Sequence, residues 1–512
     1  MIDITVGDLL VRAAKLYPKK MATAYQGNCE NFSDFYNDTL KYKDYLENHG
    51  CTKGDRVAVI SRNRPEILKL LFASALAGYV FVPINFRLTE GEVSFLIDDC
   101  EPSILFTDET FKNTCNKAAN ASKKFNTQNI ADIQFPLETL KDNLPSNYSI
   151  DVKPEDLFGI FYTSGTTGSP KGVMLSHRNM LSGVINHTIA YQLSPSDICL
   201  HIMPLYHTME SSLALCQFFV GGGNVIEDHF DKNKFWETID FYGVTHTTGV
   251  FTMLQGMLEA SKKIDGSAGK TLKTISLGGQ SVPRDIMEKA ISILGEGRII
   301  QVYGLTEASP LVTYLPREDM LDTSSENKLI GSVGKELYLC KVKIINAEGN
   351  EIGPNQPGEV LVNGSNVMMG YWKRDDDTKN ALSNGWLHTG DIGKIDEDGY
   401  LFLVDRMKDL IISGGENITP GEVEEVIFGH PNVIECSVFG VSDDTWGESV
   451  VGAVCVNDSS ITEKDIQSYC LAHLAKYKVP KHIIFMDSLP KDPVGKIQKR
   501  ILKQSILDYT GE

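Results

Sequence analysis

The sequence predicts an α/β protein: a large N-terminal domain of two packed α/β subdomains plus a β-rich subdomain, followed by a small α+β C-terminal domain. Three observations carry this prediction. Over the first 400 residues, helical periodicity alternates with short β-branched runs. After about residue 330 the pattern changes to short alternating strands. Beyond Asp405 the chain continues for about 100 residues, which is enough for an independent unit.

Helix and strand patterns follow one another closely in the first part of the chain. We expect a helix over Glu66–Leu76 and a strand over Tyr79–Val82, with further strands over Leu272–Leu277 and Arg298–Tyr303. Such alternation predicts parallel sheets flanked by helices, with ligands at the carboxyl ends of the strands.

Short strands with hairpin turns mark the β-rich subdomain, expected over about 330–404. Val342–Ile345, Glu359–Val362 and Tyr400–Val404 read as strands, and the turns at Ala347–Asn350 and Asp396–Gly399 have hairpin chemistry. The predicted domains are therefore 1–404 and 405–512.

Composition narrows the class of protein. The 512 residues are 42% hydrophobic and 23% charged, the balance of an ordinary globular chain. A formal net charge of -18 argues against a nucleic-acid partner but allows an anionic ligand at a local basic site. The ten cysteines are dispersed, which suits a reducing cytoplasm. The most apolar stretch, Leu70–Ile84, is interrupted by Gly78 and Pro83, so we expect no transmembrane segment and a cytoplasmic protein.

The stretch TSGTTGSPKG, Thr163–Gly172, follows the strand-like run Leu157–Tyr162. Its hydroxyls, backbone N–H groups and Lys171 suit a polyphosphate, and its glycines let the main chain approach closely. The spacing does not match a P-loop, because Pro170 precedes the lysine and Gly172 follows it. Taken alone, a surface loop explains it as well.

Other polar fragments recur along the chain: YGLTE at Tyr303–Glu307, GWLHTGD at Gly385–Asp391, DRMKDLIISGGENI from Asp405 and PVGKI at Pro493–Ile497. Singly, Tyr303 reads as a core aromatic, Asp391 as a turn residue and Lys496 as a solvated charge. Together and in this order, the set resembles the adenylate-forming superfamily of acyl-CoA synthetases, adenylation domains and luciferases, closest in pattern to fatty-acyl and aryl acyl-CoA ligases. The resemblance runs over nearly the whole chain.

The resemblance implies activation of a carboxylic acid by ATP and Mg²⁺ to an acyl-adenylate, with pyrophosphate release and transfer to CoA. It assigns the β- and γ-phosphates to Thr163, Ser164, Gly165, Thr166, Thr167, Gly168 and Lys171. Adenine would lie along Tyr303 and Gly304, with Gly279 and Gln280 at its edge, and the ribose would contact Asp391 and Arg406. Thr306 would contact the α-phosphate and Glu307 would hold Mg²⁺, a cation that suits a carboxylate.

The C-terminal domain would be mobile. Lys408 matches the hinge of the family, and rotation about it would exchange Lys496, which bridges the carboxylate and the α-phosphate, for a thiol channel lined by Gly414, Gly415 and Glu416. No general base is required, because the carboxylate is ionised at pH 7.

The acyl group is less well defined. Tyr206-His207-Thr208 matches fatty-acyl and aryl ligases and makes His207 a gate between acyl pocket and thiol, although a core histidine fits too. We expect the pocket wall at 245–251 and 276–278; its mixed polarity, with His246 and Glu210, favours a short- or medium-chain acid, with a cationic acid left open. The alternatives are an enzyme that loads a carrier protein and a non-catalytic or oxygen-using relative. A homodimer is left open.

Overall fold

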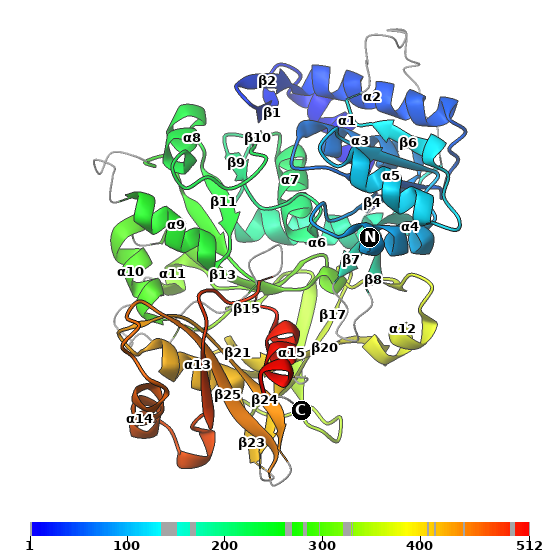
Figure 1. The fold of residues 1–512 in the computed structure, drawn as a ribbon. Coiled ribbons are helices and arrows are strands. Elements are labelled where there is room, and N and C mark those ends of the chain that lie inside the picture. Colours follow the sequence, from blue (N-terminus) through cyan, green and yellow to red (C-terminus); the bar gives the residue numbers. More distant parts are fainter. Residues whose placement is uncertain are drawn as a thin grey trace.

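The computed structural model describes residues 3–134, 151–163, 170–261, 269–279, 284–295, 297–320, 329, 331–406, 409–413, 416–443, 446–491 and 497–510. Four sheets carry the architecture (Figure 1). Two large sheets form the upper body in that view, and the C-terminal unit, coloured orange to red, lies below them.

The first large sheet has seven strands, of which five are parallel. In spatial order they are β18 (Gly370–Tyr371), β8 (Lys171–Ser176), β7 (Leu157–Thr163), β4 (Val80–Pro83), β3 (Arg56–Ile60), β5 (Ile104–Thr107) and β6 (Ile130–Asp132). Strands β7 and β8 are antiparallel neighbours, so the segment between them returns the chain directly. Helices α2 (Phe32–Asn48), α3 (Pro65–Ala77), α4 (Glu90–Cys100) and α5 (Lys112–Ala121) belong to this part of the chain.

The second large sheet has nine strands. In spatial order they are β15 (Lys335–Glu336), β14 (Leu311–Tyr314), β13 (Ile299–Gly304), β12 (Thr274–Leu277), β11 (His246–Gly249), β9 (Ile198–His201), β10 (Gly223–Ile226), β1 (Met21–Tyr25) and β2 (Asn28–Asn31). The six strands from β13 to β1 are parallel. The associated helices are α1 (Val6–Leu16), α6 (His177–Ala190), α7 (Thr208–Val220), α8 (Phe235–Tyr242), α9 (Phe251–Ser261), α10 (Arg284–Leu294) and α11 (Arg317–Met320).

One hydrophobic core joins the two large sheets. It takes Phe81 and Phe161 from the first sheet, Cys199 and Ile300 from the second, and buried residues of α1, α3, α6 and α7. Helices α3 and α7 are apolar on most of their surface because both sides are covered, whereas α1 keeps an exposed polar face.

The remaining two sheets are smaller. The third contains β16 (Cys340–Ile345), β17 (Gly358–Gly364), β20 (Trp386–Ile395), β19 (Leu382–Ser383) and β21 (Leu401–Arg406), and α12 (Asp375–Ala381) lies beside it. The C-terminal sheet contains β23 (Glu416–Ile418), β22 (Ile411–Ser413), β25 (Gly447–Val456), β24 (Val433–Asp443) and β26 (His482–Phe485), with helices α13 (Pro420–Phe428), α14 (Glu463–His473) and α15 (Lys499–Thr510).

Local sequence explains where elements begin and end. Pro65 occupies the first turn of α3, where its missing N–H is not needed, and Gly78 ends that helix with φ 72°. Thr89 and Glu92 form a capping box at the start of α4. The predicted turn at Asp396–Gly399 is confirmed, since Asp396 N–H donates to Tyr400 O and Gly399 has φ 87°.

The predicted fold class is confirmed, including the two α/β subdomains and the β-rich region. The proposed division at 404/405 stays a prediction, and β21 spans it. Among the described helices, none has the length and apolar character needed to cross a bilayer.

Candidate active site

The carboxyl ends of β13, β12, β11 and β9 meet at one edge of the nine-stranded sheet. Gly304 ends β13, and Thr306 and Glu307 follow in a short 3₁₀ turn, Thr306–Ala308. A Cβ on Gly304 would lie 1.9 Å from the carbonyl oxygen of Pro310, so only glycine fits there. Gly279 follows β12 with φ +84°. The predicted motif residues therefore occupy the edge where α/β proteins bind ligands.

Tyr303 and Asp391 come together although 88 residues separate them. The Tyr303 hydroxyl donates a 2.7 Å hydrogen bond to Asp391 Oδ2, and both residues are buried. Asp391 lies on β20, directly opposite Arg406 of β21 in the antiparallel ladder. The structure thus gathers three residues that the resemblance assigns to adenine and ribose, and it draws them from two sheets.

Thr163 and Lys171 close the phosphate segment at its two ends. They pair across β7 and β8, and Thr163 Oγ1 lies 3.4 Å from the carbonyl oxygen of Lys171. Lys171 Nζ lies 2.6 Å from Asp377 Oδ1 on α12. The Asp377 carboxylate orients the Lys171 ammonium group. The Lys171 side chain is still 14% exposed, so the charge remains accessible.

Glu307 is hydrogen-bonded to Tyr371 of strand β18. The Tyr371 hydroxyl donates to Glu307 Oε1 at 2.9 Å. Burial, followed by the charge of Glu307, raises the pKa of Tyr371, so the hydroxyl stays a donor at neutral pH. Thr306 Oγ1 accepts a 3.3 Å hydrogen bond from Thr208 Oγ1, which ties this turn to the first turn of α7.

His207 caps α7 on the loop 202–207 that leaves β9. Asn63 clamps this loop: its Nδ2 donates to Met203 O and its Oδ1 accepts from Leu205 N–H, both at 2.7 Å. The His207 ring lies 4.3 Å from that of Tyr206, and its Nε2 is buried without a hydrogen-bond partner among the described residues. Burial, with a smaller effect of Arg87, lowers the pKa of His207 to about 4, so the ring is neutral at pH 7.

Glu210 has an internal partner in the core. It is fully buried, and its Oε1 lies 2.6 Å from His201 Nδ1, while His201 Nε2 faces Asn224 Oδ1 at 2.8 Å. Asn224 Nδ2 donates to Ala22 O, which fixes the amide orientation and makes Nε2 of His201 a donor. Burial raises the pKa of Glu210, and the bond from His201 opposes that rise.

His246 also has an internal partner. It begins β11, opposite Cys199 and Thr274, at the amino edge of the sheet. There Nδ1 lies 3.7 Å from Asp197 Oδ1, and burial lowers the pKa of His246 to about 4. Glu210 and His246 therefore each have an internal partner, and the expected acyl pocket stays a prediction.

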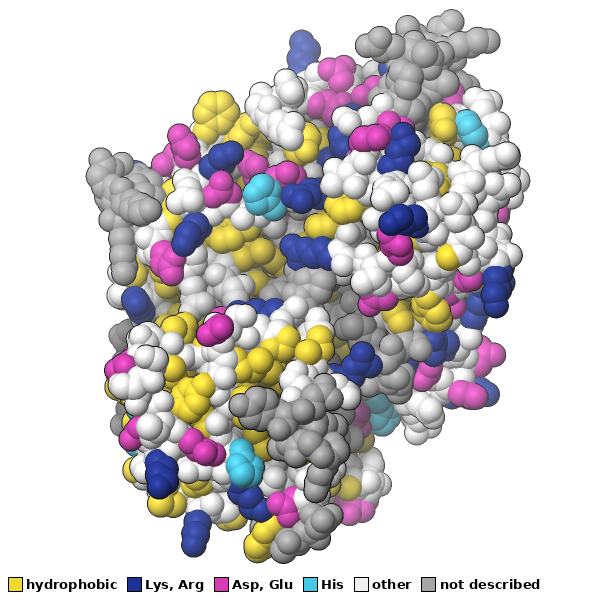
Figure 2. Space-filling model, viewed as in Figure 1, with side chains coloured by type: hydrophobic (Ala, Val, Ile, Leu, Met, Phe, Trp, Pro, Cys, Tyr) yellow, Lys and Arg dark blue, Asp and Glu magenta, His cyan; other side chains and the backbone are white. Residues whose placement is uncertain are grey.

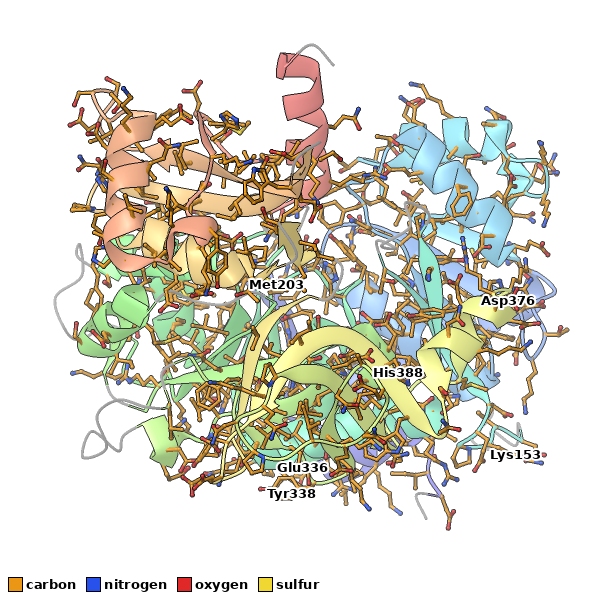
Figure 3. The ribbon with its side chains drawn as sticks, turned by 90° about the horizontal axis from the view of Figure 1, so that it is seen from below. Lys153, Met203, Glu336, Tyr338, Asp376 and His388 are labelled. Carbon is orange, nitrogen blue, oxygen red and sulfur yellow. The ribbon has the colours of Figure 1, made fainter. Side chains whose placement is uncertain are left out.

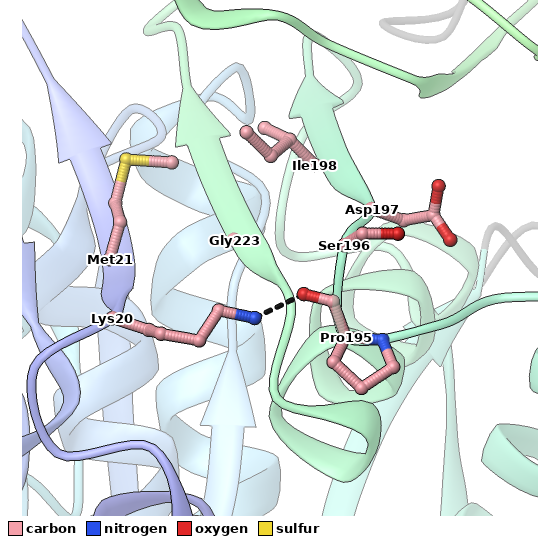
Figure 4. Close-up of a pocket in the computed structure, with 7 residues that line it drawn as sticks. All are labelled: Lys20, Met21, Pro195, Ser196, Asp197, Ile198 and Gly223. Atoms are coloured by element: carbon pink, nitrogen blue, oxygen red, sulfur yellow. Dashed lines mark hydrogen bonds between the residues drawn. The ribbon is translucent and has the colours of Figure 1, made fainter.

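A cavity of about 460 Å³ lies at this amino edge (Figure 4). The first residues of β1, β9 and β10 line it, and Lys20 spans it to reach the carbonyl oxygens of Pro195 and Gly221. It is on the edge opposite Gly304 and Gly279, so it is separate from the candidate site.

Several predicted site residues lie outside the described residues: Ser164, Gly165, Thr166, Thr167, Gly168, Gln280, Lys408, Gly414, Gly415 and Lys496. Of Arg406 and Glu416 the structure describes the backbone, in β21 and β23. Lys491 and Ile497, which flank the segment of Lys496, form an antiparallel bridge. The face of the molecule drawn in Figure 2 is hollowed between the C-terminal unit and the upper body.

Sequence reasoning missed three residues that contact the site. Tyr371 bonds to Glu307, and Asp377 bonds to Lys171. Glu359 bonds to His388 Nδ1 at 2.9 Å and accepts from the N–H of Gly390, which steadies the part of β20 before Asp391 where the pairing register shifts. His388 lies on the long strand β20 (Figure 3). Asp377 is hidden in the run Asp375–Asp377, which reads as a solvated helix start, and Tyr371 and Glu359 sit in motifs without any catalytic signal.

The family models for "AMP-binding enzyme" and "AMP-binding enzyme C-terminal domain" match residues 10–372 and 422–496. The chain belongs to the family of AMP-binding enzymes, and the adenylate-forming resemblance is confirmed. A 2-succinylbenzoate–CoA ligase of Bacillus mycoides (strain KBAB4) is 32% identical over 98% of this chain and 99% of its own length.

Two further relatives are named as a CoA synthase and a coenzyme A synthetase. A feruloyl-CoA synthase of Amycolatopsis sp. is 34% identical over 96% of this chain and 97% of its own. The solved O-succinylbenzoate coenzyme A synthetase of Bacillus subtilis, in complex with ATP and a magnesium ion, is 30% identical with a TM-score of 0.86, covering 97% of this chain and 99% of the other. The predicted enzyme class, an AMP-forming acid–thiol ligase, is confirmed.

Proposed function

We propose that this protein activates an aryl carboxylic acid with ATP and Mg²⁺, releases pyrophosphate and transfers the acyl group to CoA. The observation that carries the proposal is that three sheets bring these groups together: Tyr303 of β13 is bonded to Asp391 of β20, Glu307 lies in the turn that follows β13, and Tyr371 contacts both Glu307 and Lys171, the first residue of β8. These supply an aromatic face, a carboxylate and an ammonium, the groups that a nucleotide, a divalent cation and a phosphate require.

The residues present fit a magnesium nucleotide. No group of three or more candidate ligands gathers among the described His, Cys, Asp and Glu residues. Mg²⁺ is ordinarily held by one or two carboxylates together with substrate phosphates, and the partly exposed Glu307 suits that arrangement. When bound, Mg²⁺ would neutralise charge on the phosphates.

The residue roles implied by the resemblance are carried forward as proposals. Lys171 and the segment 163–168 would bind the outer phosphates, Thr306 the α-phosphate, and Asp391 and Arg406 the ribose. Lys496 would stabilise the charge that develops when the carboxylate attacks the α-phosphate, because two anions repel each other until a cation bridges them. Rotation about Lys408 would then bring Gly414, Gly415 and Glu416 to CoA.

An aryl acid is favoured by the side chains around His207. The rings of Phe111, Phe86 and Tyr206 form a chain with centroid separations of 5.4 and 5.6 Å that ends at His207. Such a wall suits an aromatic ring by edge and face contacts. The internal partner of Glu210 removes the reason for a cationic acid. The relatives named for 2-succinylbenzoate and ferulate support the same class, and short- or medium-chain acids are the alternative.

The test is pyrophosphate release with MgATP across a carboxylate panel, with and without CoA. The panel contains aryl acids, linear acids from short to long, dicarboxylates, carnitine-like acids and amino acids. We expect the strongest CoA-dependent release from an aryl acid, and a loss of about 10²–10³-fold in Lys496→Ala, the scale for one transition-state donor.

Other outcomes would change the proposal in defined ways. A linear acid as the best substrate contradicts the aryl assignment. Release that only a holo-carrier protein accelerates supports carrier loading instead. Lys491→Ala is the matched control, because Lys491 lies five residues before Lys496 in the sequence but pairs with Glu435.

A further inference from the structure

Among the described residues, one carboxylate lies close to Lys171, and it belongs to a different element. Its Nζ lies 2.6 Å from Asp377 Oδ1, and Arg374 Nη1 lies 3.6 Å from Asp377 Oδ2. The hydrogen bond from Lys171 lowers the pKa of Asp377, so this carboxylate is ionised at neutral pH. The pair is partly accessible, with 14% of the Lys171 side chain and 32% of the Asp377 side chain exposed.

The segment that carries Asp377 is fixed to the strand that carries Lys171. Gly370 and Tyr371 of β18 pair with Met174 and Val173 of β8, two to three residues beyond Lys171. Thr378 Oγ1 accepts from Tyr371 N–H at 2.8 Å and thereby ties α12 back to β18. The position of Asp377 beside Lys171 is therefore built into the fold.

Tyr371 stands between the two charged groups of the site. Lys171 Nζ lies 5.1 Å from the centre of its ring, and its hydroxyl donates to Glu307. The short segment from Gly370 to Thr378 therefore contacts both the cation and the carboxylate that the proposed function assigns to phosphate and Mg²⁺.

We propose that Asp377 is an internal competitor of the nucleotide's phosphates for Lys171 and so sets the affinity for polyphosphate. This rests on the proposed function. A lysine ammonium is a compact charge on a flexible stem, so it can exchange one oxygen acceptor for another. A phosphate that reaches Lys171 must share it with Asp377 or displace that carboxylate, and it also meets the like charge of Asp377. When pyrophosphate leaves, Asp377 recaptures the lysine.

The size of the effect follows from the exposure of the pair. Partly exposed ion pairs are weak, so removing the competitor should tighten binding about three- to fivefold. Arg374 remains beside the site when Asp377 is neutralised, so the local field becomes more positive. The expected sign is therefore tighter binding, the reverse of what loss of a ligand-binding residue produces.

The experiment measures the Kd of MgATP and of magnesium pyrophosphate by calorimetry, without a carboxylic acid, so that no turnover occurs. We expect Asp377→Asn to lower both Kd values about three- to fivefold. Asp377→Ser, which removes the same charge with a shorter side chain, must give the same sign. Asp376→Asn is the matched control, since its fully exposed carboxylate lies 3.9 Å from Lys379 on the outer side of α12 (Figure 3).

A double-mutant cycle decides whether the effect passes through Lys171. In a Lys171→Met background, Asp377→Asn should leave the Kd unchanged. Three outcomes would each overturn the proposal. Asp376→Asn lowers the Kd as much as Asp377→Asn does, Asp377→Asn still lowers the Kd in the Lys171→Met background, or Asp377→Asn raises the Kd. If the wild-type protein binds no MgATP, the proposed function fails as well; if it binds but Asp377→Asn is silent, only this inference fails.

Discussion

The polar residues at the two edges of the nine-stranded sheet differ in burial and in the number of hydrogen bonds that they receive. At the amino edge, Asp197 is 1% exposed and accepts three hydrogen bonds: from Lys273 Nζ at 2.7 Å and from the N–H and hydroxyl of Ser194. At the carboxyl edge, Thr306 and Glu307 are partly exposed, and Glu307 receives one side-chain bond, from Tyr371.

This difference distinguishes polar residues that stabilise the fold from polar residues that can bind a ligand. A buried carboxylate that accepts three hydrogen bonds from its own chain stabilises the fold and has little capacity left for a ligand. A partly exposed carboxylate with one partner keeps oxygen sites available. A cavity also lies at the amino edge, so the presence of a cavity does not by itself identify the active site. Four variants test this contrast.

Glu307→Gln should give the largest effect on activity. The amide keeps the shape but removes the charge proposed to hold Mg²⁺, so adenylation should fall by about 10²-fold or more, the scale for one electrostatic group in a transition state. The measurement is pyrophosphate release at saturating acid, with the melting temperature as control. Activity retained at ordinary Mg²⁺ would contradict the metal role.

Asp197→Asn should destabilise the protein without changing catalysis. Its new amide donors would face the N–H and hydroxyl of Ser194, so buried groups lose their acceptor, at a cost of about 1–3 kcal/mol. Denaturant unfolding measures the cost, and kcat/KM of the folded fraction should stay within about twofold of wild type. A selective loss of activity would place function at the amino edge.

Glu210→Gln should affect the acid and thiol sides more than the nucleotide side. The His201–Glu210 pair joins the end of β9 to the first turn of α7 and so braces the loop that carries His207. We expect kcat/KM for the acid to fall by about three- to tenfold, the scale of one ordinary hydrogen bond, while the Kd of MgATP stays unchanged. An equal loss in both would indicate a general structural role.

Acid should destabilise the protein through its buried histidines. Burial lowers the pKa of His187 to about 3 and those of His177 and His246 to about 4, each from an ordinary value of 6.5. The unfolded chain therefore binds more protons below pH 6.5, so stability is full above that pH and is lost as pH falls towards about 4. His187→Gln should flatten the dependence of the free energy of unfolding on pH; an unchanged slope would contradict the assignment.

Much of this could be predicted from sequence because the signals are local. The β7 strand, the α3–β4 unit and the turn at Asp396 follow from periodicity and turn residues, and YGLTE and GWLHTGD identify Tyr303 and Asp391. Their direct contact could not be predicted, since it depends on how two sheets pack. The partners of Glu210 and His246 were missed for the same reason: a polar residue in a core segment gives no indication of which strand will satisfy it.

The bond between Tyr303 and Asp391 has a consequence for how the protein is made. The chain is synthesised from its amino end, and both large parallel sheets are nearly complete in sequence once β13 has emerged from the ribosome. The carboxylate that receives the Tyr303 hydroxyl belongs to a strand translated later. A nascent chain ending between these residues has the Tyr303 hydroxyl without its acceptor, so the bond between Tyr303 and Asp391 cannot guide the folding of the two large sheets during synthesis.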